Sequence, residues 1–358
     1  MKNKKIGILT FHWVDNYGAL LQCYALLSFI LNLGYECNVI NYIPPKIKKN
    51  DSLFRLKPSL FIKDLLFFKQ HFLRRLQSNS FRKKFIKLSK FDASFDFLVV
   101  GSDQIWNLPM TYSDRAYFGI GFKNKDMYII SYAASLGQNL PVEYQEVFFE
   151  NLKNISKISV REETAKSYIS KGSYVDVQVV LDPVFLLSKK DWLNIIPRKR
   201  LINKPYIFVY SVDNGNDKFV KIVDKISEYL NLGVVCSGKS FYRNRNYKNI
   251  LKTYETGGPL IFLNYLFHSD FVVTSSFHGT AFSLILQKDF ISVCPSSNAS
   301  RLTDLLKRFD CYSRIITDIS ELNKNLLKEK IDYQIICERL DFEIEKSASW
   351  LTKALNEN

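Results

Sequence analysis

The sequence predicts an α/β protein with two domains, each built on a parallel β-sheet. Short apolar runs of strand length alternate with longer stretches of helical periodicity, and this alternation occurs twice, in residues 6–190 and 200–330. Such alternation is typical of a parallel sheet with helices on both faces. The 358 residues suffice for two separate cores, and 47% hydrophobic with 24% charged residues is typical of a soluble globular chain.

The first domain opens with a strand, a loop, a helix and a second strand, expected at residues 6–11, 12–18, 19–33 and 37–40. Gly34 ends the helix, as glycine commonly does. Ligands of open parallel sheets bind at the carboxyl ends of the strands, which makes His12, Asn16 and Tyr17 candidate binding residues. The alternative is ordinary turn chemistry at Asn16-Tyr17-Gly18.

Residues 46–90 form a basic segment inserted in this domain. They hold fourteen Lys and Arg against two acids, a net +12 of the whole-chain +15. Large apolar residues recur there at helical spacing after Pro58, so the segment predicts a basic amphipathic helix suited to an anionic membrane surface. Alternatively, the apolar face packs on the domain and the basic face is solvated. Nucleic-acid binding is not expected, because no recognised motif accompanies the charge.

A buried strand expected at 95–100 is followed by polar residues at its carboxyl end. Asp103 and Gln104 can accept and donate hydrogen bonds there, and Asp103 can take a proton from a ligand hydroxyl. The alternative for Asp103 is a cap on the following turn. Trp106 either offers a ligand an apolar platform or fills the core.

Two more strands are expected at 127–134 and 155–160, and Arg161-Glu162 follow the second directly. The planar guanidinium of an Arg binds phosphate or carboxylate at two points and stays charged. Arg161 is therefore a candidate anion ligand. A surface ion pair between Arg161 and Glu162 is the alternative.

Residues 192–200 are polar and basic, and we take them as the linker between the domains. A second α/β series follows, with strands expected at 206–210, 234–237, 271–274 and 291–294 and helices at 217–230 and 259–267. A final helix is expected from Tyr333 to about residue 355.

Residues 271–282 contain the most specific local sequence pattern in the chain. A β-branched strand turns through Ser275-Ser276-Phe277-His278, and a helix starts near Gly279. A helix start presents backbone N–H groups and the positive end of the helix dipole, and the side chains of Ser276, His278 and Thr280 add donors, so it can seat a phosphate. The alternative is a plain crossover in which His278 packs or caps. Arg301 opens a later helix on the same sheet.

Six short segments resemble motifs of one known family. They are His12 with Asn16-Tyr17-Gly18-Ala19, Gly101-Ser102-Asp103-Gln104-Ile105-Trp106-Asn107, Ser131-Tyr132-Ala133-Ala134-Ser135-Leu136-Gly137, Val160-Arg161-Glu162, Asp182-Pro183, and Ser276-Phe277-His278-Gly279-Thr280-Ala281-Phe282-Ser283. Their order, from residue 6 to about residue 310, resembles the polysaccharide pyruvyl transferase family. The resemblance implies a GT-B-like fold, two Rossmann-like domains facing across a cleft. Residues 1–190 would be the acceptor side, residues 200–330 the donor side, and residues 331–358 a helix crossing back to the first domain.

The resemblance also implies an activity. Pyruvate would pass from phosphoenolpyruvate to a sugar, of galactose type and as a 4,6-ketal, in a lipid-linked or polymeric surface-glycan precursor, with release of phosphate. The expected catalytic residues are His278, Asp103 and Glu162. The expected donor-binding residues are Arg161, Ser276, Phe277, His278, Gly279 and Arg301, and the expected acceptor-binding residues are His12, Asn16, Tyr17, Asp103, Gln104 and Trp106. Some branches of the family carry an Arg where this chain has Ser276, and Arg301 is the candidate replacement.

Two other functions stay open at this point: a GT-B glycosyltransferase using a nucleotide sugar, and a non-catalytic protein binding glycan or membrane. We expect no cofactor besides the co-substrate and no metal, because the six cysteines and four histidines show no metal-ligand spacing. The cysteines are expected as reduced, buried thiols. No stretch reaches the roughly 18 to 20 apolar residues of a membrane span. We expect a cytoplasmic protein, free or at the inner face of the membrane.

Overall fold

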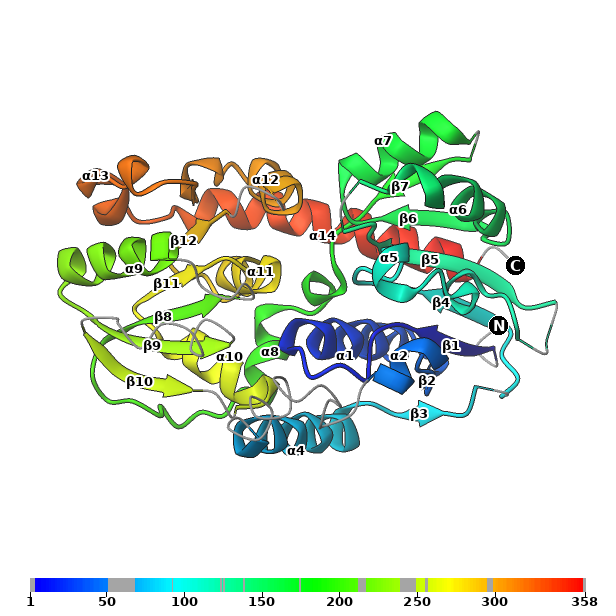
Figure 1. Ribbon diagram of the computed structural model, residues 1–358, viewed down its shortest axis with the longest axis horizontal. Helices are drawn as coiled ribbons and strands as arrows, with labels where there is room; N and C mark the ends of the chain where they lie inside the picture. The colour runs from blue at the N-terminus through cyan, green and yellow to red at the C-terminus, as the bar shows by residue number, and fades with distance from the viewer. Residues whose placement is uncertain are drawn as a thin grey trace. The chain divides into compact units, whose positions relative to one another are not determined.

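The computed structural model describes residues 4–50, 68–91, 93–122, 124, 126–137, 139–173, 175–211, 217–238, 249–254, 257–294 and 299–356. The chain divides into two compact units (Figure 1). Unit 1 comprises Met1–Leu187 with Phe342–Asn358, and unit 2 comprises Ser188–Asp341. The expected domain ranges were 1–190 and 200–330, with residues 331–358 assigned to a crossing helix.

Unit 1 is built on a seven-stranded sheet in which every pairing is parallel. Its order is β3 (Leu88–Ser89), β2 (Glu36–Ile40), β1 (Lys5–Leu9), β4 (Phe97–Val100), β5 (Tyr128–Ala134), β6 (Lys157–Val160) and β7 (Val177–Val179). The chain moves outward from β1 in one direction and from β4 in the other. The strand order therefore reverses between β1 and β4, which is where ligands of such sheets bind.

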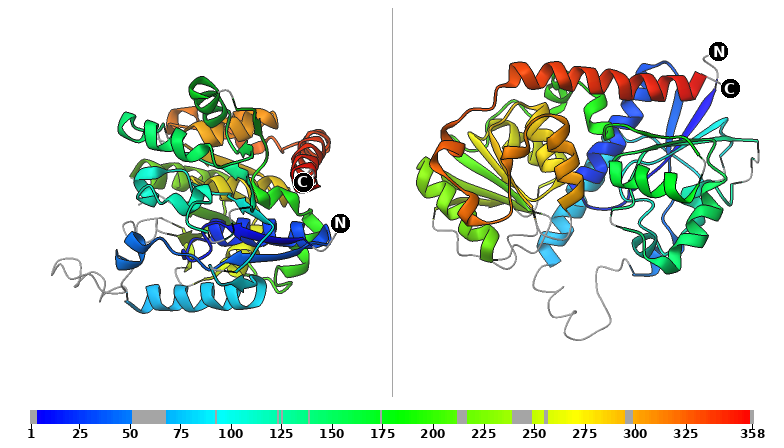
Figure 2. Two further views of the ribbon diagram at one scale, coloured as in Figure 1. Left: turned by 90° about the vertical axis from the view of Figure 1, so that its right-hand side faces the viewer. Right: turned by 90° about the horizontal axis from the view of Figure 1, so that it is seen from above.

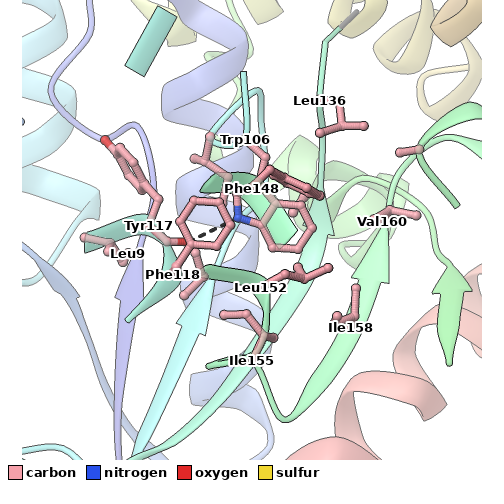
Figure 3. Packing of buried hydrophobic residues seen from close by; sticks show 14 of the residues in the cluster. Leu9, Trp106, Tyr117, Phe118, Leu136, Phe148, Leu152, Ile155, Ile158 and Val160 are labelled. Atoms are coloured by element: carbon pink, nitrogen blue, oxygen red, sulfur yellow. Dashed lines mark hydrogen bonds between the residues drawn. The ribbon is translucent and has the colours of Figure 1, made fainter. Parts of the chain in front are cut away.

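The strands of unit 1 are apolar runs because both faces of the sheet are covered. In β4 all four residues are buried, and in β1 all but Lys5 are buried. Continuous burial of this kind is typical of parallel sheets. Trp106, Phe118 and Phe148 extend the core beyond the strands, as Figure 3 shows.

The helices of unit 1 have clear local causes. They are α1 (Tyr17–Asn32), α2 (Pro45–Asn50), α4 (Phe68–Phe85), α5 (Leu108–Thr111), α6 (Gln145–Leu152) and α7 (Glu163–Gly172), with 3-10 turns η1 (Arg115–Phe118), η2 (Val142–Tyr144) and η3 (Pro183–Leu186). Asn16 caps α1 by accepting from the Ala19 amide at 3.2 Å. Tyr17 is therefore the first residue of the helix and not part of the loop.

Unit 2 repeats the architecture with six parallel strands. Their order is β10 (Ile250–Tyr254), β9 (Gly233–Gly238), β8 (Tyr206–Ser211), β11 (Phe271–Thr274), β12 (Phe290–Val293) and β13 (Ile315–Ile316). The order reverses between β8 and β11. The loop that follows β11 thus lies at the switch point of its own sheet.

The helices of unit 2 are α8 (Lys189–Ile195), α9 (Asp217–Leu230), α10 (Pro259–His268), α11 (Phe277–Ile285), α12 (Ala299–Arg308) and α13 (Lys324–Lys328), with 3-10 turns η5 (Tyr312–Arg314) and η6 (Ile319–Glu321). The polar linker expected at 192–200 is wrong in its first part, because α8 covers it to Ile195. Trp192 anchors α8, fully buried against the Phe282 ring with centroids 4.8 Å apart.

The C-terminal helix α14 (Tyr333–Asn356) is one uninterrupted helix, drawn in red in Figure 2. Its residues from Phe342 onward belong to unit 1. There the Ser347 hydroxyl accepts from the Leu181 amide at 2.9 Å, and Trp350 packs on Tyr132 with ring centroids 6.2 Å apart. The end of the chain is thus part of the packing of unit 1.

Candidate functional site

The β1–α1 loop of unit 1 holds the first expected binding residues. His12 is buried, with Nδ1 3.3 Å from the Thr10 carbonyl oxygen and Nε2 3.2 Å from Asn41 Oδ1. Burial lowers the pKa of His12, which favours the neutral ring. A neutral ring has one N–H, so His12 can donate to only one of these two oxygen atoms, and the tautomer decides which.

The same loop shows that the three expected acceptor residues here have structural partners. Both ring nitrogens of His12 are engaged, Asn16 caps α1, and Tyr17 is buried in the first turn of α1. The turn-chemistry interpretation therefore describes Asn16 in this structure. His12 and Tyr17 are buried and shape the loop, whereas Asn16 is exposed although its side chain caps α1.

An arginine that the sequence did not single out holds this loop. Arg82 on α4 donates from Nε to the His12 carbonyl at 2.7 Å and from Nη2 to the carbonyls of Trp13 and Val14, both at 2.7 Å. Nη2 also pairs with Asp15 Oδ1 at 2.8 Å. Nearly seventy residues separate Arg82 from the loop, so no local pattern could have revealed the contact.

The basic segment at 46–90 is described at residues 46–50, in α2, and from Phe68 onward, mainly as helix α4. Residues 51–67, with Pro58, lie outside the described residues. Phe81 is buried against Tyr24 of α1, ring centroids 6.0 Å apart, so this part of α4 packs on the domain. Phe72 and Leu76 remain 42% and 48% exposed. They lie one turn apart on a helix that ends in Arg82-Lys83-Lys84.

The loop after β4 presents Asp103 at the switch point of unit 1. Asp103 is partly exposed, adopts a positive φ of 71°, and accepts from the Gln104 amide at 2.9 Å. Gly101 precedes it with φ 125°, and a Cβ there would lie 2.2 Å from the Tyr132 carbonyl oxygen. The loop therefore requires glycine, and its shape leaves the Asp103 carboxylate accessible.

Trp106 corrects an expectation. It is fully buried, its Nε1 donates to the Tyr117 carbonyl at 3.1 Å, and it stacks on Phe118 with ring centroids 5.8 Å apart (Figure 3). A side chain sealed in this way cannot serve as a platform for an acceptor. Trp106 fills the core, which was the other interpretation of the residue.

Arg161 and Glu162 belong to an internal ionic network at the same edge of the sheet. Arg161 Nη1 pairs with Asp182 Oδ2 at 2.7 Å, and Arg161 Nε lies 3.8 Å from Glu162 Oε2. The three side chains are at most 4% exposed. Burial alone would lower the pKa of Arg161, but Asp182 and Glu162 outweigh it and raise this pKa.

The network contradicts two expectations for this pair. The surface ion pair is wrong, because both side chains are buried. The donor-clamp role for Arg161 also conflicts with the structure, because a guanidinium already paired with two carboxylates has little attraction left for an anion. Glu162 also has hydrogen-bond partners within unit 1, because its Oε1 accepts from the Ser135 hydroxyl at 2.7 Å and from the Leu136 amide at 3.1 Å.

The edge of unit 1 therefore carries more carboxyl groups than cations within this network. Asp182 and Glu162 pair with Arg161, and Asp103 is close enough to affect the same guanidinium. Ser102 ties β4 to the network by donating to Asp182 Oδ2 at 3.1 Å. Such a surface disfavours an anionic ligand and suits a ligand with hydroxyl groups.

The edge of unit 2 is built differently, from hydroxyl groups and a helix start. Ser276 caps α11 by accepting from the Gly279 amide at 3.4 Å, and Thr274 Oγ1 accepts from the Ser276 amide at 3.1 Å. A Cβ at Gly279 would lie 2.2 Å from Thr274 Oγ1, so only glycine lets the helix start this close to the strand. His278 is the second residue of α11, largely buried, with the Phe277 ring edge-on at 5.3 Å.

The helix α11 is held firmly at this position. Thr280 and Ser292 share a hydrogen bond of 2.7 Å between α11 and β12, and Ser275 donates to Ser211 at 2.9 Å across the switch point. Arg301 lies in the first turn of α12, which packs against α11. Ser276, His278, Gly279 and Arg301 thus belong to neighbouring elements of one unit.

Five cysteines are buried as expected, Cys337 is instead partly exposed, and all six are free thiols in the structure. No cluster of His, Cys, Asp or Glu within the described ranges has the make-up of a metal site. Nor does any helix in that part of the chain combine the length and apolarity needed to span a bilayer.

Comparison with solved structures places this architecture among known folds. The chain matches a putative UDP-N-acetylglucosamine 2-epimerase from Listeria monocytogenes with TM-score 0.57 and 10% identity, covering 99% of this chain and 98% of that one. It matches the UDP-GlcNAc 2-epimerase from Neisseria meningitidis with TM-score 0.54 and 10% identity, covering 99% and 100%. The glycosyltransferase SnogD from Streptomyces nogalater matches with TM-score 0.45 and 10% identity, covering 99% and 100%.

The two matches with TM-scores above 0.5 establish the fold, a GT-B-like pair of parallel-sheet α/β domains, and at 10% identity they say nothing about activity. A search of curated protein sequences returned no match to this chain. The profile of one family does match, under the description polysaccharide pyruvyl transferase, over residues 16–297. That range contains both the Gly101–Gln104 loop of unit 1 and the α11 start of unit 2, and it covers well over half of the sequence. This transferase chain belongs to the polysaccharide pyruvyl transferase family.

Proposed function

We propose that the enzyme transfers the pyruvyl group of phosphoenolpyruvate to two hydroxyls of a galactose-type sugar, forming a 4,6-ketal in a lipid-linked or polymeric surface-glycan precursor. The observation that carries the proposal is the family match over residues 16–297, which includes the loop after β4 in unit 1 and the loop after β11 in unit 2. The reaction adds a proton to the methylene carbon of the donor. One sugar hydroxyl then attacks its central carbon, and the second hydroxyl closes the ketal as phosphate leaves.

In this proposal the donor binds unit 2. Its phosphate and carboxylate are negative, and the α11 start offers them the positive end of a helix dipole. His278 in the first turn supplies the proton, and a positioned histidine typically contributes about 10² to 10⁴ in rate. Ser276, Phe277 and Gly279 shape the seat, and Arg301 on the adjacent α12 provides the cation that Ser276 does not.

The acceptor in turn binds unit 1. Asp103 is the proposed general base, because it is partly exposed at the switch point whereas Glu162 is buried and bonded to Ser135. Gln104 beside it offers an amide to a sugar hydroxyl. Arg161 holds Asp182 and Glu162 in place and so positions the strand ends instead of binding the donor.

A cytoplasmic location beside the anionic inner membrane face is also part of the proposal. It is supported by Phe72 and Leu76, exposed on one face of α4, and by the basic residues that end this helix. Apolar side chains inserted among headgroups, together with nearby Lys and Arg, give an amphipathic helix its affinity for such a surface. Contact there would bring the enzyme to lipid-linked acceptors.

The experiment that tests the function is a direct assay. The protein is incubated with phosphoenolpyruvate and a panel of galactosides, and mass spectrometry and phosphate release are followed together. We expect one pyruvyl ketal per phosphate released. No ketal from any galactoside, combined with thermal stabilisation by UDP or GDP and none by phosphoenolpyruvate, would instead identify a nucleotide-sugar glycosyltransferase.

A further inference from the structure

Three aromatic side chains without a role in the site described so far follow the carboxyl ends of three neighbouring strands. Trp13 comes after β1, Tyr42 after β2 and Phe91 after β3, and all three are partly exposed. The strands are adjacent and parallel, so their carboxyl ends meet at one edge of the sheet. This is the edge on which Asp103 lies, after β4.

The three rings are joined by two buried ones into a continuous wall. Tyr42 stacks on Phe91 with ring centroids 4.7 Å apart, and Tyr117 meets Tyr42 at 6.4 Å and Phe11 at 5.6 Å. Phe11 in turn meets Trp13 at 6.1 Å. We call Trp13, Phe11, Tyr117, Tyr42 and Phe91 the aromatic wall.

Polar contacts fix both ends of the aromatic wall. The Tyr42 hydroxyl donates to the two carboxylate oxygens of Asp114 at 2.9 and 3.0 Å, and burial raises the Tyr42 pKa, so the hydroxyl stays a donor. At the other end, Arg82 binds the carbonyls on both sides of the Trp13 side chain. A surface held in this way loses little conformational freedom when a ligand binds.

The chemistry of the aromatic wall selects its ligand. It offers partly exposed rings beside carboxylates, although Phe91 also packs on Phe122 with ring centroids 4.4 Å apart. Arg82, the cation that borders Trp13, already donates to His12, Trp13, Val14, Asp15 and Asn79, so it offers an anionic ligand little. A neutral sugar ring, with C–H faces for the aromatic rings and hydroxyls for the carboxylates, matches both features.

The extent of the aromatic wall indicates how much of the ligand it binds. Neighbouring strands lie about 4.8 Å apart, so the wall extends about 10 Å from β1 to β3 and begins one strand away from Asp103. We propose that the aromatic wall binds the sugar residues of the acceptor glycan next to the one that is modified, with Trp13 as platform and Arg82 as its positioning residue. This inference rests on the proposed function for the identity of the acceptor.

Binding is tested first, without catalysis. Intrinsic tryptophan fluorescence is titrated with a galactose monosaccharide and with longer galactose-containing oligosaccharides. The oligosaccharides should change the emission of the wild type and of Trp350→Phe, a control for another partly exposed tryptophan of unit 1. The change should vanish in Trp13→Phe. An unaltered change in Trp13→Phe would overturn the inference.

Kinetics then separate a binding role from a merely structural one. Trp13→Ala and Phe91→Ala should each raise KM for an oligosaccharide about five- to tenfold, the loss expected for one aromatic contact, and leave the KM values of the monosaccharide and phosphoenolpyruvate unchanged. Arg82→Ala should act like Trp13→Ala and speed hydrogen exchange at residues 12–16, and Arg82→Lys should restore part of both. The inference would be contradicted if each substitution changed KM by the same factor for short and long acceptors.

The two possible failures can be told apart. If oligosaccharides bind through Trp13 but no pyruvyl group is transferred, the proposed function fails and the binding site stands. If transfer occurs with the same KM for short and long acceptors and no effect of Trp13→Ala, the function stands and the binding site fails. The melting temperature of each variant, compared with that of the wild type, tells a loss of binding or activity from a loss of folded protein.

Discussion

The carboxyl edges of the two sheets share one topology but differ in their chemistry. At the edge of unit 1, Asp103, Glu162 and Asp182 surround a single guanidinium, that of Arg161. At the edge of unit 2, a capped helix start carries His278, and Arg301 opens the adjacent helix. The fold supplies the position of a site, and the side chains at the switch point decide whether an anion or a polyol binds there.

The largest expected effect comes from removing His278 of unit 2. His278→Ala should lower the rate of phosphate release in the presence of acceptor by about 10² to 10⁴, the usual contribution of a positioned acid. His268→Gln, a partly exposed histidine of the same unit, is the matched control and should change little. A His278→Ala rate within a few-fold of wild type would remove the proposed proton donor.

The next test concerns the edge of unit 1 and distinguishes a structural from a donor-binding arginine. Arg161→Met leaves two buried carboxyl groups without their cation, which should lower the free energy of unfolding by about 3 to 5 kcal/mol in urea denaturation. The exposed pair between Lys153 and Glu150 is the control, and Lys153→Met should cost about 1 kcal/mol or less. Equal effects of the two substitutions would contradict the buried network.

A third test compares Gly279, which lets the start of α11 lie close to its strand, with Gly121, which has open space around it. Gly279→Ala places a methyl group against Thr274, and the strain should cost about 1 to 3 kcal/mol in thermal unfolding and displace the α11 start. Gly121, unlike Gly279, has a positive φ, and nothing lies within 4 Å of its Cβ position. Gly121→Ala should therefore cost about 1 kcal/mol through its backbone alone. A smaller cost at Gly279 than at Gly121 would show that helix and strand do not approach closely.

The smallest expected effect is a pH dependence that both units share. Burial lowers the pKa of His12 in unit 1 and of His268 in unit 2 below the ordinary value of 6.5. The unfolded chain then binds more protons than the native protein, so stability is full above pH 6.5 and falls as the pH drops from there toward the lowered pKa values. His12→Gln should remove its part of this slope in urea titrations at several pH values. An unchanged slope would indicate that His12 titrates normally.

Much of the fold followed from sequence pattern because its central strands are long apolar runs. Strands expected at 206–210 and 271–274 and the helix at 217–230 are found within a residue at each end. The edge strands β3, β7 and β13 have only two or three residues, too few for periodicity to mark them. Helix α8 was missed because Trp192, which anchors it, lies among polar residues.

The site was less predictable, because charge balance depends on residues distant in sequence. The sequence alone suggests that Arg161 binds an anion, because its partner Asp182 lies 21 residues further along the chain. In the sequence, Trp106 can be interpreted as a platform for a ligand, but in the structure it packs against Phe118 and Phe148. By contrast, the helix start at His278 is local, because the cap Ser276 and Gly279 lie within four consecutive residues, so this element could be predicted from the sequence.

The central claim is that the phosphorylated donor is bound by unit 2 and not by the acidic edge of unit 1. Calorimetric titration of phosphoenolpyruvate into wild type, His278→Ala, Arg161→Met and Asp103→Asn tests it most directly. The account predicts that affinity falls sharply in His278→Ala and stays near the wild-type value in Arg161→Met and Asp103→Asn. Affinity kept in His278→Ala and lost in Arg161→Met would contradict it.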